Sequence, residues 1–339
     1  MKLFEIRADY DLNVMTENQS LSQLTAGILV HLQSVMDREK PDWVLLQGDT
    51  TTVAAASISA TYHRVKLAHV EAGLRTHNKA HPFPEEINRR VAAALADLHL
   101  APTEQARRNL LQEGVPANRI TLTGNPIVDA VQWATAQPFD NELLPAAMLA
   151  HPARKLVLVT AHRRESFGER FENICWAVRD LAERYVEDVN FVYPVHPNPN
   201  VHEPAYRILG QSKNITLTPP LDYVTFLNLM KRAYLVLTDS GGVQEEAGTL
   251  GVPVVILREW TERGELVELG IGKIVGFDRV GIVDEVSALL DCEFDYRQMV
   301  RQLHPYGDGK ASPRIAAALM RAAGLPAGEP VLPVEFVLD

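Results

Sequence analysis

The segment Ala233–Leu257 reads AYLVLTDSGGVQEEAGTLGVPVVIL, and its two apolar ends enclose a glycine pair and two glutamates. The runs AYLVL and VVIL are apolar at every position, which is typical of strands buried on both faces of a parallel sheet. Between them, Asp-Ser-Gly-Gly ends the first strand, and a helical pattern follows. The segment therefore predicts a strand–helix–strand unit of an α/β sheet.

The same alternation of short apolar runs and longer helical patterns recurs along the chain. The other predicted strands are WVLLQGD, LAHVEAG, LHLAPT, ITLTG, KLVLVTAH, NFVYPVH and NITLTPPL. Such alternation favours parallel sheets covered by helices, so we expect two doubly wound, Rossmann-like domains. The proline-punctuated stretch Gln137–Lys155 is the expected seam. The expected divisions are 1–150 for the first domain, joined by a C-terminal helix at about 312–323, 151–311 for the second, and 324–339 for a tail.

Length and composition exclude several classes of protein. The 339 residues, 46% of them hydrophobic, can form about two domains, and the net charge of -10 disfavours a nucleic-acid partner. Cys175 and Cys292 lie far apart, without the spacing of a metal or redox motif. The sequence has no signal-peptide pattern and no apolar run near the roughly 18 residues of a membrane span. We therefore expect a soluble, cytoplasmic protein without a metal site.

Polar residues follow the predicted strands. Ligands of doubly wound sheets bind beyond the carboxyl ends of the strands, so these residues are candidates for function. In the first domain they are Asp49, Glu71 and the pair Glu85 and Glu86; in the second they are His162, Arg163, His196, Asp239 and Ser240. One domain thus offers carboxylates, and the other offers cations and a glycine turn.

The glycine turn has a functional and a purely structural interpretation. Gly241 and Gly242 allow backbone N–H groups to approach a ligand, and the helix N-terminus favours an anion, so a diphosphate is expected there. Glu245 and Glu246, one turn later, are placed to accept hydrogen bonds from a ribose. Alternatively, Ser240 or Gly242 is an N-cap and the glutamates complement the helix dipole. A full G-x-G-x-x-G pattern is absent, so the spacing alone leaves both interpretations open.

The other candidate residues also have structural interpretations. Ser166–Glu169 fits a capping box, and the pair Glu85 and Glu86 follows Pro84 at a favourable helix start. Asp49 precedes three threonines and can serve as an N-cap. Glu71, in contrast, ends a strand with no helix to cap, so it is the carboxylate that most strongly indicates function.

Taken together, the motifs resemble the bacterial non-hydrolysing UDP-N-acetylglucosamine 2-epimerases. They are LLQGDTTTVAAA, HVEAGLRT, PFPEEINRR, GNPIVDA, TAHRRESFG, YPVHPNPNV, LTDSGGVQEEA, TERGEL and PYGDGKAS, in the order of that family, and they extend from about Asp9 to about Arg321. The resemblance implies a GT-B fold, in which two Rossmann-like domains face each other across a cleft, usually in a homodimer. It also implies interconversion of UDP-GlcNAc and UDP-ManNAc without a redox cofactor or a catalytic metal.

The resemblance further implies a mechanism and its residues. UDP is eliminated to leave 2-acetamidoglucal and is then added back, with a proton delivered to the other face of C2. This chemistry requires general acids and bases near the sugar and stabilisation of the departing diphosphate. The implied catalytic residues are Asp49, Glu71, Glu85 and His162. The implied substrate-binding residues are Phe226 at the uracil, Ser240, Gly241 and Gly242 at the phosphates, Glu246 at the ribose and Arg263 at the diphosphate. Arg163 and His196 match residues of an allosteric site for a second UDP-GlcNAc.

The sequence departs from the family at its start. Relatives begin with an apolar strand that ends in a Gly-Thr-Arg-Pro-Glu loop, and this sequence does not contain it. We therefore expect an N-terminally truncated first domain and weak activity at best, unless Arg75 or Arg89 replaces the missing cations. A smaller departure is Gly264, where many relatives have proline. The alternatives to an active epimerase are a UDP-sugar-binding protein with little or no turnover and another GT-B enzyme, either a hydrolysing epimerase or a glycosyltransferase.

Overall fold

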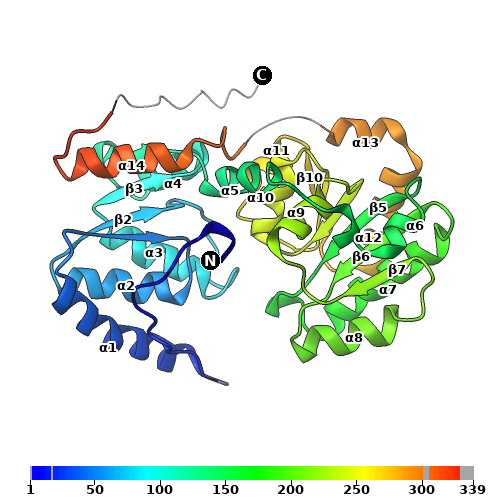
Figure 1. The fold of residues 1–339 in the computed structure, drawn as a ribbon, viewed down its shortest axis with the longest axis horizontal. Helices are drawn as coiled ribbons and strands as arrows, with labels where there is room; N and C mark the ends of the chain where they lie inside the picture. The colour runs from blue at the N-terminus through cyan, green and yellow to red at the C-terminus, as the bar shows by residue number, and fades with distance from the viewer. Residues whose placement is uncertain (1, 17, 301–304, 329–339) are drawn as a thin grey trace. The chain divides into compact units, whose positions relative to one another are not determined.

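The chain divides into two compact units, each built around its own parallel sheet (Figure 1). The computed structural model describes residues 2–16, 18–300 and 305–328. Unit 1 contains the chain up to Asn125 and the segment that begins at Ser312, and unit 2 contains Pro126–Ala311. None of the helices in the described residues combines the length and apolar character of a membrane span.

Unit 1 contains a four-stranded sheet with the order β1-β2-β3-β4, and every neighbouring pair is parallel. Helices α1 and α2 lie on one side of this sheet and α14 lies on the other (Figure 1). Strand β1 is at the edge of the sheet, and its Leu45 is 48% exposed. The elements of unit 1 are η1 (Lys2–Phe4), α1 (Leu21–Glu39), β1 (Trp43–Gln47), α2 (Thr51–Tyr62), β2 (Lys66–Val70), α3 (Glu85–Leu95), β3 (Leu98–Ala101), α4 (Glu104–Gln112), η2 (Ala117–Arg119), β4 (Ile120–Leu122) and α14 (Ala311–Ala322).

Small residues let the helices of unit 1 approach the sheet closely. Ala55 and Ala60 of α2 and Ala92 of α3 are fully buried. Gly73, after β2, has φ 97°, and a Cβ at this position would lie 2.2 Å from the carbonyl oxygen of Ala106. Only glycine tolerates both this conformation and this approach, so the HVEAGLRT motif has a packing role as well as a chemical one.

Unit 2 contains a six-stranded parallel sheet with the order β10-β9-β8-β5-β6-β7. Numbered within the unit, this is the doubly wound order 3-2-1-4-5-6 of Rossmann folds, in which ligands bind where the winding reverses, here between β5 and β8. The elements of unit 2 are α5 (Pro126–Thr135), η3 (Asn141–Leu143), α6 (Ala146–Ala150), β5 (Lys155–Thr160), η4 (Arg164–Ser166), α7 (Glu169–Arg184), β6 (Val189–Pro194), α8 (Pro199–Leu209), β7 (Ile215–Thr218), α9 (Tyr223–Met230), β8 (Leu235–Thr238), α10 (Gly241–Thr249), β9 (Val254–Ile256), α11 (Gly264–Glu268), β10 (Gly272–Ile274), α12 (Arg279–Asp291) and α13 (Glu293–Met299).

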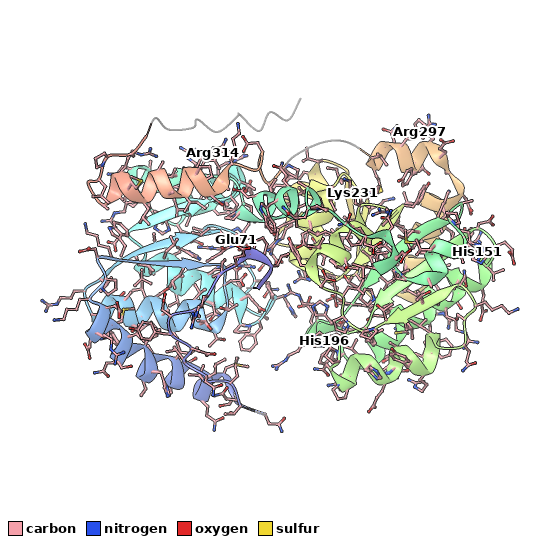
Figure 2. All side chains as sticks on the ribbon, viewed as in Figure 1. Glu71, His151, His196, Lys231, Arg297 and Arg314 are labelled. Carbon is pink, nitrogen blue, oxygen red and sulfur yellow. The ribbon has the colours of Figure 1, made fainter. Side chains whose placement is uncertain are left out.

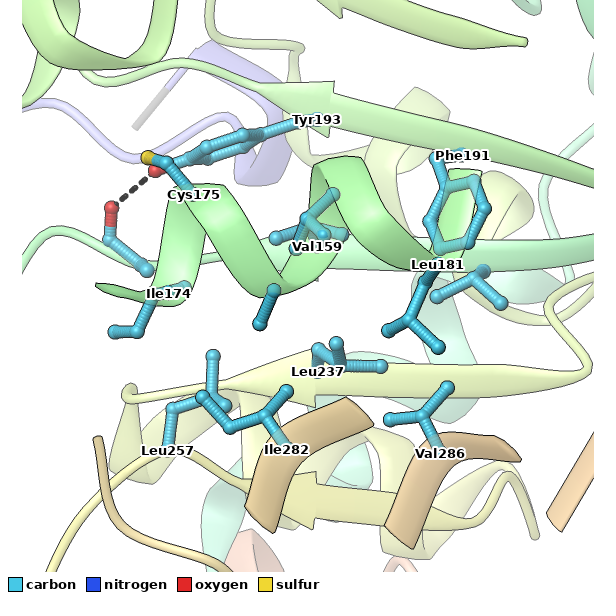
Figure 3. Packing of buried hydrophobic residues seen from close by; sticks show 14 of the residues in the cluster. Val159, Ile174, Cys175, Leu181, Phe191, Tyr193, Leu237, Leu257, Ile282 and Val286 are labelled. Atoms are coloured by element: carbon cyan, nitrogen blue, oxygen red, sulfur yellow. Dashed lines mark hydrogen bonds between the residues drawn. The ribbon is translucent and has the colours of Figure 1, made fainter. Parts of the chain in front are cut away.

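Both faces of this sheet are covered by apolar clusters, as expected for strands without polar alternation. On one face, Phe191 and Leu237 pack with side chains of α7 and α12, including Leu181 and Ile282 (Figure 3). On the other face, strand residues such as Leu158 pack with α9 and α10. Successive strand residues therefore enter opposite cores, which holds the strand ends rigidly in place.

The observed fold confirms the α/β prediction and refines its details. All nine predicted strands are present, whereas β10 was not predicted, because its sequence Gly-Lys-Ile is too short to form a pattern. The contacts place the division at Asn125, earlier than the expected seam at Gln137–Lys155. The physical reason is that α5 packs on α9 and α10 and buries Val131 and Ala134 against Leu227.

Candidate active site

In unit 1, Glu71 lies beside the turn that follows β1. Strands β1 and β2 end level with each other, with Gln47 paired to Val70. Gly48 has φ 82°, and Glu71, the residue after β2, has φ 64°. A Cβ built on Gly48 would lie 3.5 Å from Oε2 of Glu71. Glu71 is labelled in Figure 2. A left-handed glutamate at a strand end is uncommon, and such residues concentrate at functional sites.

The buried side chain of His69 contacts the backbone of the Gly48 turn. Its Nε2 lies 2.7 Å from the carbonyl oxygen of Gly48. Burial lowers the pKa of His69, so the ring is neutral, and because a carbonyl only accepts, Nε2 must be the protonated nitrogen. The Gly48 turn is therefore anchored to the sheet.

Asp49 is held by an arginine of α3. Its Oδ2 accepts hydrogen bonds from Nε and Nη2 of Arg89, at 2.9 and 2.6 Å, and Asn88 donates to its backbone carbonyl at 2.8 Å. The N-cap of α2 is Thr50, so the N-cap interpretation of Asp49 is wrong. Arg89 is 2% exposed, so the cation that pairs with the Asp49 carboxylate is buried.

The structure separates the roles of Glu85 and Glu86. Glu86 is fully buried and accepts hydrogen bonds from the backbone N–H groups of Thr76 and His77 at 3.0 and 3.2 Å, as well as pairing with Arg89. It therefore ties α3 to the preceding loop. Glu85 is half-buried and is the first residue of α3, the helix whose Asn88 and Arg89 contact Asp49.

The two arginines considered as replacement cations both have carboxylate partners within unit 1. Arg75 forms a bidentate pair with Glu113, with distances of 2.8 and 2.7 Å. Arg89 contacts Asp49 and Glu86. Each arginine thus supports a carboxylate or a loop of its own unit.

In unit 2, the reversal point between β5 and β8 carries the predicted basic residues. The hydroxyls of Thr160 and Thr238, at the two strand ends, lie 2.7 Å apart. Beyond them, the backbone N–H groups of His162 and Arg163 both donate to Oδ2 of Asp239, each at 2.8 Å. The loop after β5 is therefore fixed to the residue that follows β8.

Ser166 takes part in this loop and does not cap a helix. Its hydroxyl donates to the carbonyl oxygen of Arg163 at 2.6 Å and lies 3.3 Å from Oδ2 of Asp239. Helix α7 begins at Glu169 with Gly168 at the N-cap position. The predicted capping box is wrong, because α7 begins after Gly168 and the Ser166 hydroxyl donates within η4, to the carbonyl oxygen of Arg163.

The rings of His162 and His196 stack, so the residues that follow β5 and β6 lie side by side. Their ring centroids are 5.4 Å apart with an interplanar angle of 14°. His196 is exposed (Figure 2), and Arg163 is half-buried. The structure therefore groups His162, Arg163 and His196, three of the basic residues that the sequence predicted in this unit.

The two glycines of the turn have different environments. A Cβ on Gly241 would lie 2.9 Å from the guanidinium carbon of Arg263, whereas a Cβ on Gly242 would meet nothing within 4 Å. Gly241 thus makes room for the arginine, and Gly242 borders open space. Ser240 occupies the N-cap position of α10 without a side-chain capping bond. The turn therefore combines a helix N-terminus, an arginine and free volume, which is suitable for an anion.

Arg263 belongs to a buried chain of alternating charges. It pairs with Glu262 and donates from Nε to Glu245 at 3.0 Å. Glu262 also accepts from Arg258 at 3.0 Å, and Arg258 pairs with Glu165 at 2.7 Å. Arg258 and Glu262 were not predicted from the sequence, although their i, i+4 spacing was a signal. Glu245 supports Arg263, so the ribose prediction falls on Glu246 alone.

Glu246 is a buried carboxyl next to α9. It is 7% exposed, and burial raises its pKa to about 7, while the nearby Tyr223 opposes this shift. Phe226 lies about one turn after Tyr223 on α9 and is half-buried against the core cluster that contains Leu229. Glu246 lies one turn into α10, and Phe226 packs against the core cluster that contains Ala247 of the same helix.

The cysteines lie apart from these groups. Cys175 is buried in α7, and burial raises its pKa to about 12, so its thiol is unreactive. Cys292 is half-buried and has no disulfide. Within the residues that the structure describes, no group of three or more His, Cys, Asp or Glu side chains is arranged to hold a metal ion.

Known proteins share both the sequence and the fold. A family model described as UDP-N-acetylglucosamine 2-epimerase matches residues 1–320. The UDP-N-acetylglucosamine 2-epimerase of Escherichia coli strain K12 is 48% identical over 324 residues, which cover 94% of this chain and 86% of the relative. The crystal structure of UDP-GlcNAc 2-epimerase from Neisseria meningitidis bound to UDP-GlcNAc has a TM-score of 0.90 and 42% identity, covering 94% of this chain and 87% of that one. The S. aureus MnaA-UDP co-structure has a TM-score of 0.89 and 42% identity, with coverages of 96% and 86%.

Proposed function

Because this chain belongs to the UDP-N-acetylglucosamine 2-epimerase family, we propose that it interconverts UDP-N-acetylglucosamine and UDP-N-acetylmannosamine. Its two Rossmann-like units give it the GT-B fold class of its relatives. The observation that carries the proposal is the turn at the reversal point of unit 2, where Gly242 borders open space and Arg263 lies against Gly241. A helix N-terminus, an arginine and open space together suit an anionic nucleotide.

The proposed nucleotide site lies within unit 2. The diphosphate binds at Ser240, Gly241 and Gly242, where backbone N–H groups, the helix dipole and Arg263 offset its charge. Glu246 accepts hydrogen bonds from the ribose hydroxyls, and Phe226 flanks the uracil. Support comes from the burial of Glu246 and its position one turn into α10, directly after the phosphate turn.

The proposed chemistry requires the carboxylates of unit 1. A base removes the proton from C2 while the bond from C1 to the UDP oxygen breaks, and the electron pair of the C2–H bond forms the double bond of 2-acetamidoglucal. UDP then adds to C1, and an acid delivers a proton to the opposite face of C2. Asp49, Glu71 and Glu85 supply the base and the acid, and His162 stabilises the departing diphosphate. In support, Arg89 holds Asp49, and Glu71 lies at the adjacent turn.

The remaining functional predictions concern regulation and assembly. Arg163 and His196 are proposed to contact an activating second UDP-GlcNAc, and the stacking of His162 on His196 would link the two ligands. A structure of the Methanocaldococcus jannaschii enzyme, 35% identical, is described as a complex with UDP-GlcNAc and UDP. We further propose that the protein works as a homodimer in the cytoplasm.

The test is incubation with UDP-GlcNAc in deuterated water, followed by NMR of the sugar. Epimerisation predicts deuterium at C2 together with UDP-ManNAc. Release of free ManNAc would identify a hydrolysing enzyme instead, and an acceptor-linked sugar would identify a transferase. Binding of UDP-GlcNAc without deuterium exchange at C2 would indicate a protein that binds the nucleotide sugar but does not convert it. A Glu71→Gln sample serves as the matched control for exchange that does not depend on the active site.

A further inference from the structure

Asp239 is a fully buried carboxylate whose two oxygens have unequal partners. Oδ2 accepts hydrogen bonds from the backbone N–H groups of His162 and Arg163 and lies 3.3 Å from the Ser166 hydroxyl. Oδ1 is buried and has no hydrogen-bond partner in the described part of the chain. The imidazole of His162 lies close to this oxygen, with its Nδ1 3.9 Å from Oδ1. A buried carboxylate oxygen without a donor is costly, so this asymmetry calls for a function.

We propose that Asp239 is a positioning residue for His162, in which Oδ1 accepts the Nδ1–H of the imidazole and Nε2 faces the diphosphate. The inference rests on the proposed function, which places the diphosphate beside His162. Asp239 does not touch the nucleotide in this arrangement. It acts through His162, by selecting one tautomer and one ring orientation.

The surrounding structure makes this pairing stable. Asp239 follows β8 and His162 follows β5, which are neighbouring strands at the centre of the sheet. Because Oδ2 already holds the backbone of His162, the carboxylate and the ring cannot move apart. His196 stacks on the ring and restricts its rotation. Hydrogen bonds of catalytic groups are often long without ligand, so the 3.9 Å between Nδ1 and Oδ1 is compatible with a hydrogen bond that shortens when the nucleotide binds.

The charges around His162 indicate what Asp239 contributes when a nucleotide binds. Burial lowers the pKa of His162, Asp239 raises it, and His196 and Arg163 lower it further. These groups come from the ends of β8 and β6 and from the loop after β5, and the balance keeps the ring neutral in the free protein. An arriving diphosphate adds negative charge at Nε2. The ring then takes up a proton from solvent, and Asp239 stabilises the imidazolium that donates to the diphosphate.

The first experiment determines the tautomer of His162 directly. The full chain is labelled with ¹⁵N-histidine, and the His162 signals are assigned by their loss in His162→Gln. The proposal predicts a neutral ring protonated at Nδ1, which becomes imidazolium when UDP is added. In Asp239→Asn, the amide oxygen can still accept the two backbone N–H groups, but the NH2 group faces Nδ1, so the ring should switch to the Nε2-protonated form. Asp278→Asn, which replaces an exposed N-cap of α12, is the matched control and should leave the His162 signals unchanged.

The second experiment measures C2 exchange. Asp239→Asn is expected to lower kcat about 100- to 10,000-fold, with KM changed only several-fold, because it alters the charge of His162 and preserves the turn. An unchanged tautomer together with exchange within tenfold of the wild-type rate would leave Asp239 a purely structural residue and overturn the proposal. If the variant does not fold, a wild-type ring protonated at Nε2 would overturn it equally. Absence of exchange in the wild-type protein would refute the epimerase function, while the tautomer would still decide the role of Asp239.

Discussion

The carboxyl edge of the unit 1 sheet presents carboxylates supported by a buried arginine, whereas that of unit 2 presents histidine and arginine side chains supported by buried carboxylates. In unit 1, Arg89 lies behind Asp49 and Glu86. In unit 2, Asp239 lies behind His162, and Glu245 and Glu262 hold Arg263. The two edges carry opposite types of side chain. At each edge, a proposed functional side chain is paired with a buried side chain of the opposite type.

This difference has a physical consequence for each half of the proposed reaction. A carboxylate paired with a buried arginine stays ionised and oriented, which suits a base or a hydrogen-bond acceptor. An arginine held by two buried glutamates is fixed against the glycine turn before any anion arrives, so less entropy is lost on binding. If unit 1 carries out proton transfer and unit 2 binds the nucleotide, as proposed, each role can be tested one unit at a time.

The largest expected effect is from Glu71→Gln in unit 1. Removing the charge of a catalytic carboxylate should lower C2 exchange at least ~1,000-fold, while UDP affinity, measured by calorimetry, should be unchanged because the nucleotide groups belong to unit 2. The matched control is Glu104→Gln, an exposed glutamate of α4 paired with Arg107, which should affect neither quantity. Wild-type exchange in Glu71→Gln, or loss of UDP binding, would break the division between the units.

The next effect separates the two glycines of unit 2. Gly242→Ala adds a methyl group to open space, so we expect normal folding but roughly 10- to 100-fold weaker UDP binding if the diphosphate occupies that space. Gly241→Ala would place its Cβ against the guanidinium of Arg263, so it should weaken binding and also destabilise the fold by about 1–3 kcal/mol. Thermal melts and UDP titrations of the two variants distinguish these outcomes. Equal melting temperatures with unchanged UDP affinity in both would show that the turn does not hold the nucleotide.

The sequence was sufficient for what depends on local pattern. Apolar runs located the strands, and the glycine pair located a turn that the structure places at the reversal point of the unit 2 sheet. Contacts between distant residues were not predictable: the Arg89–Asp49 pair spans 40 positions, and Asp239 meets His162 across 77. Ser166 does not cap α7 as predicted, because it ends η4 and its hydroxyl donates to the carbonyl oxygen of Arg163. Glu262 was missed because an i, i+4 pair usually indicates an exposed helix and not a buried bridge.

A smaller effect is expected on the pH dependence of the free energy of unfolding, because Glu246 is a buried carboxyl. Its pKa is raised to about 7 by burial, so the folded state binds a proton more tightly than the unfolded chain. The stability from this group is complete below the unfolded pKa of about 4.5 and is lost as the pH rises to about 7. Glu246→Gln should therefore be more stable than the wild type at pH 8, by roughly 1–3 kcal/mol, with little difference at pH 5. Urea denaturation at the two pH values is the measurement.

The control for this prediction is Glu203→Gln, an exposed glutamate of α8. It should show the same stability as the wild type at both pH values. At pH 8 the Glu246→Gln protein should also bind UDP more weakly, because the ribose loses a charged acceptor. A variant that is destabilised at pH 8 would mean that Glu246 stabilises the free fold, which would contradict its assignment as a binding residue.

The smallest expected effect is the response of each unit to the nucleotide. At ten times its Kd, UDP should stabilise the unit that binds it by about 1.4 kcal/mol, which slows the exchange of amides that open with that unit roughly tenfold. Hydrogen exchange followed by mass spectrometry should show this protection in β5 and β8, at the centre of the unit 2 sheet, and not in the edge strand β1 of unit 1. Gly242→Ala at the same UDP concentration is the matched control and should show less protection. Equal slowing of β1 and β5 would mean that the units open together, and nucleotide binding would then no longer be separable from the carboxylates of unit 1.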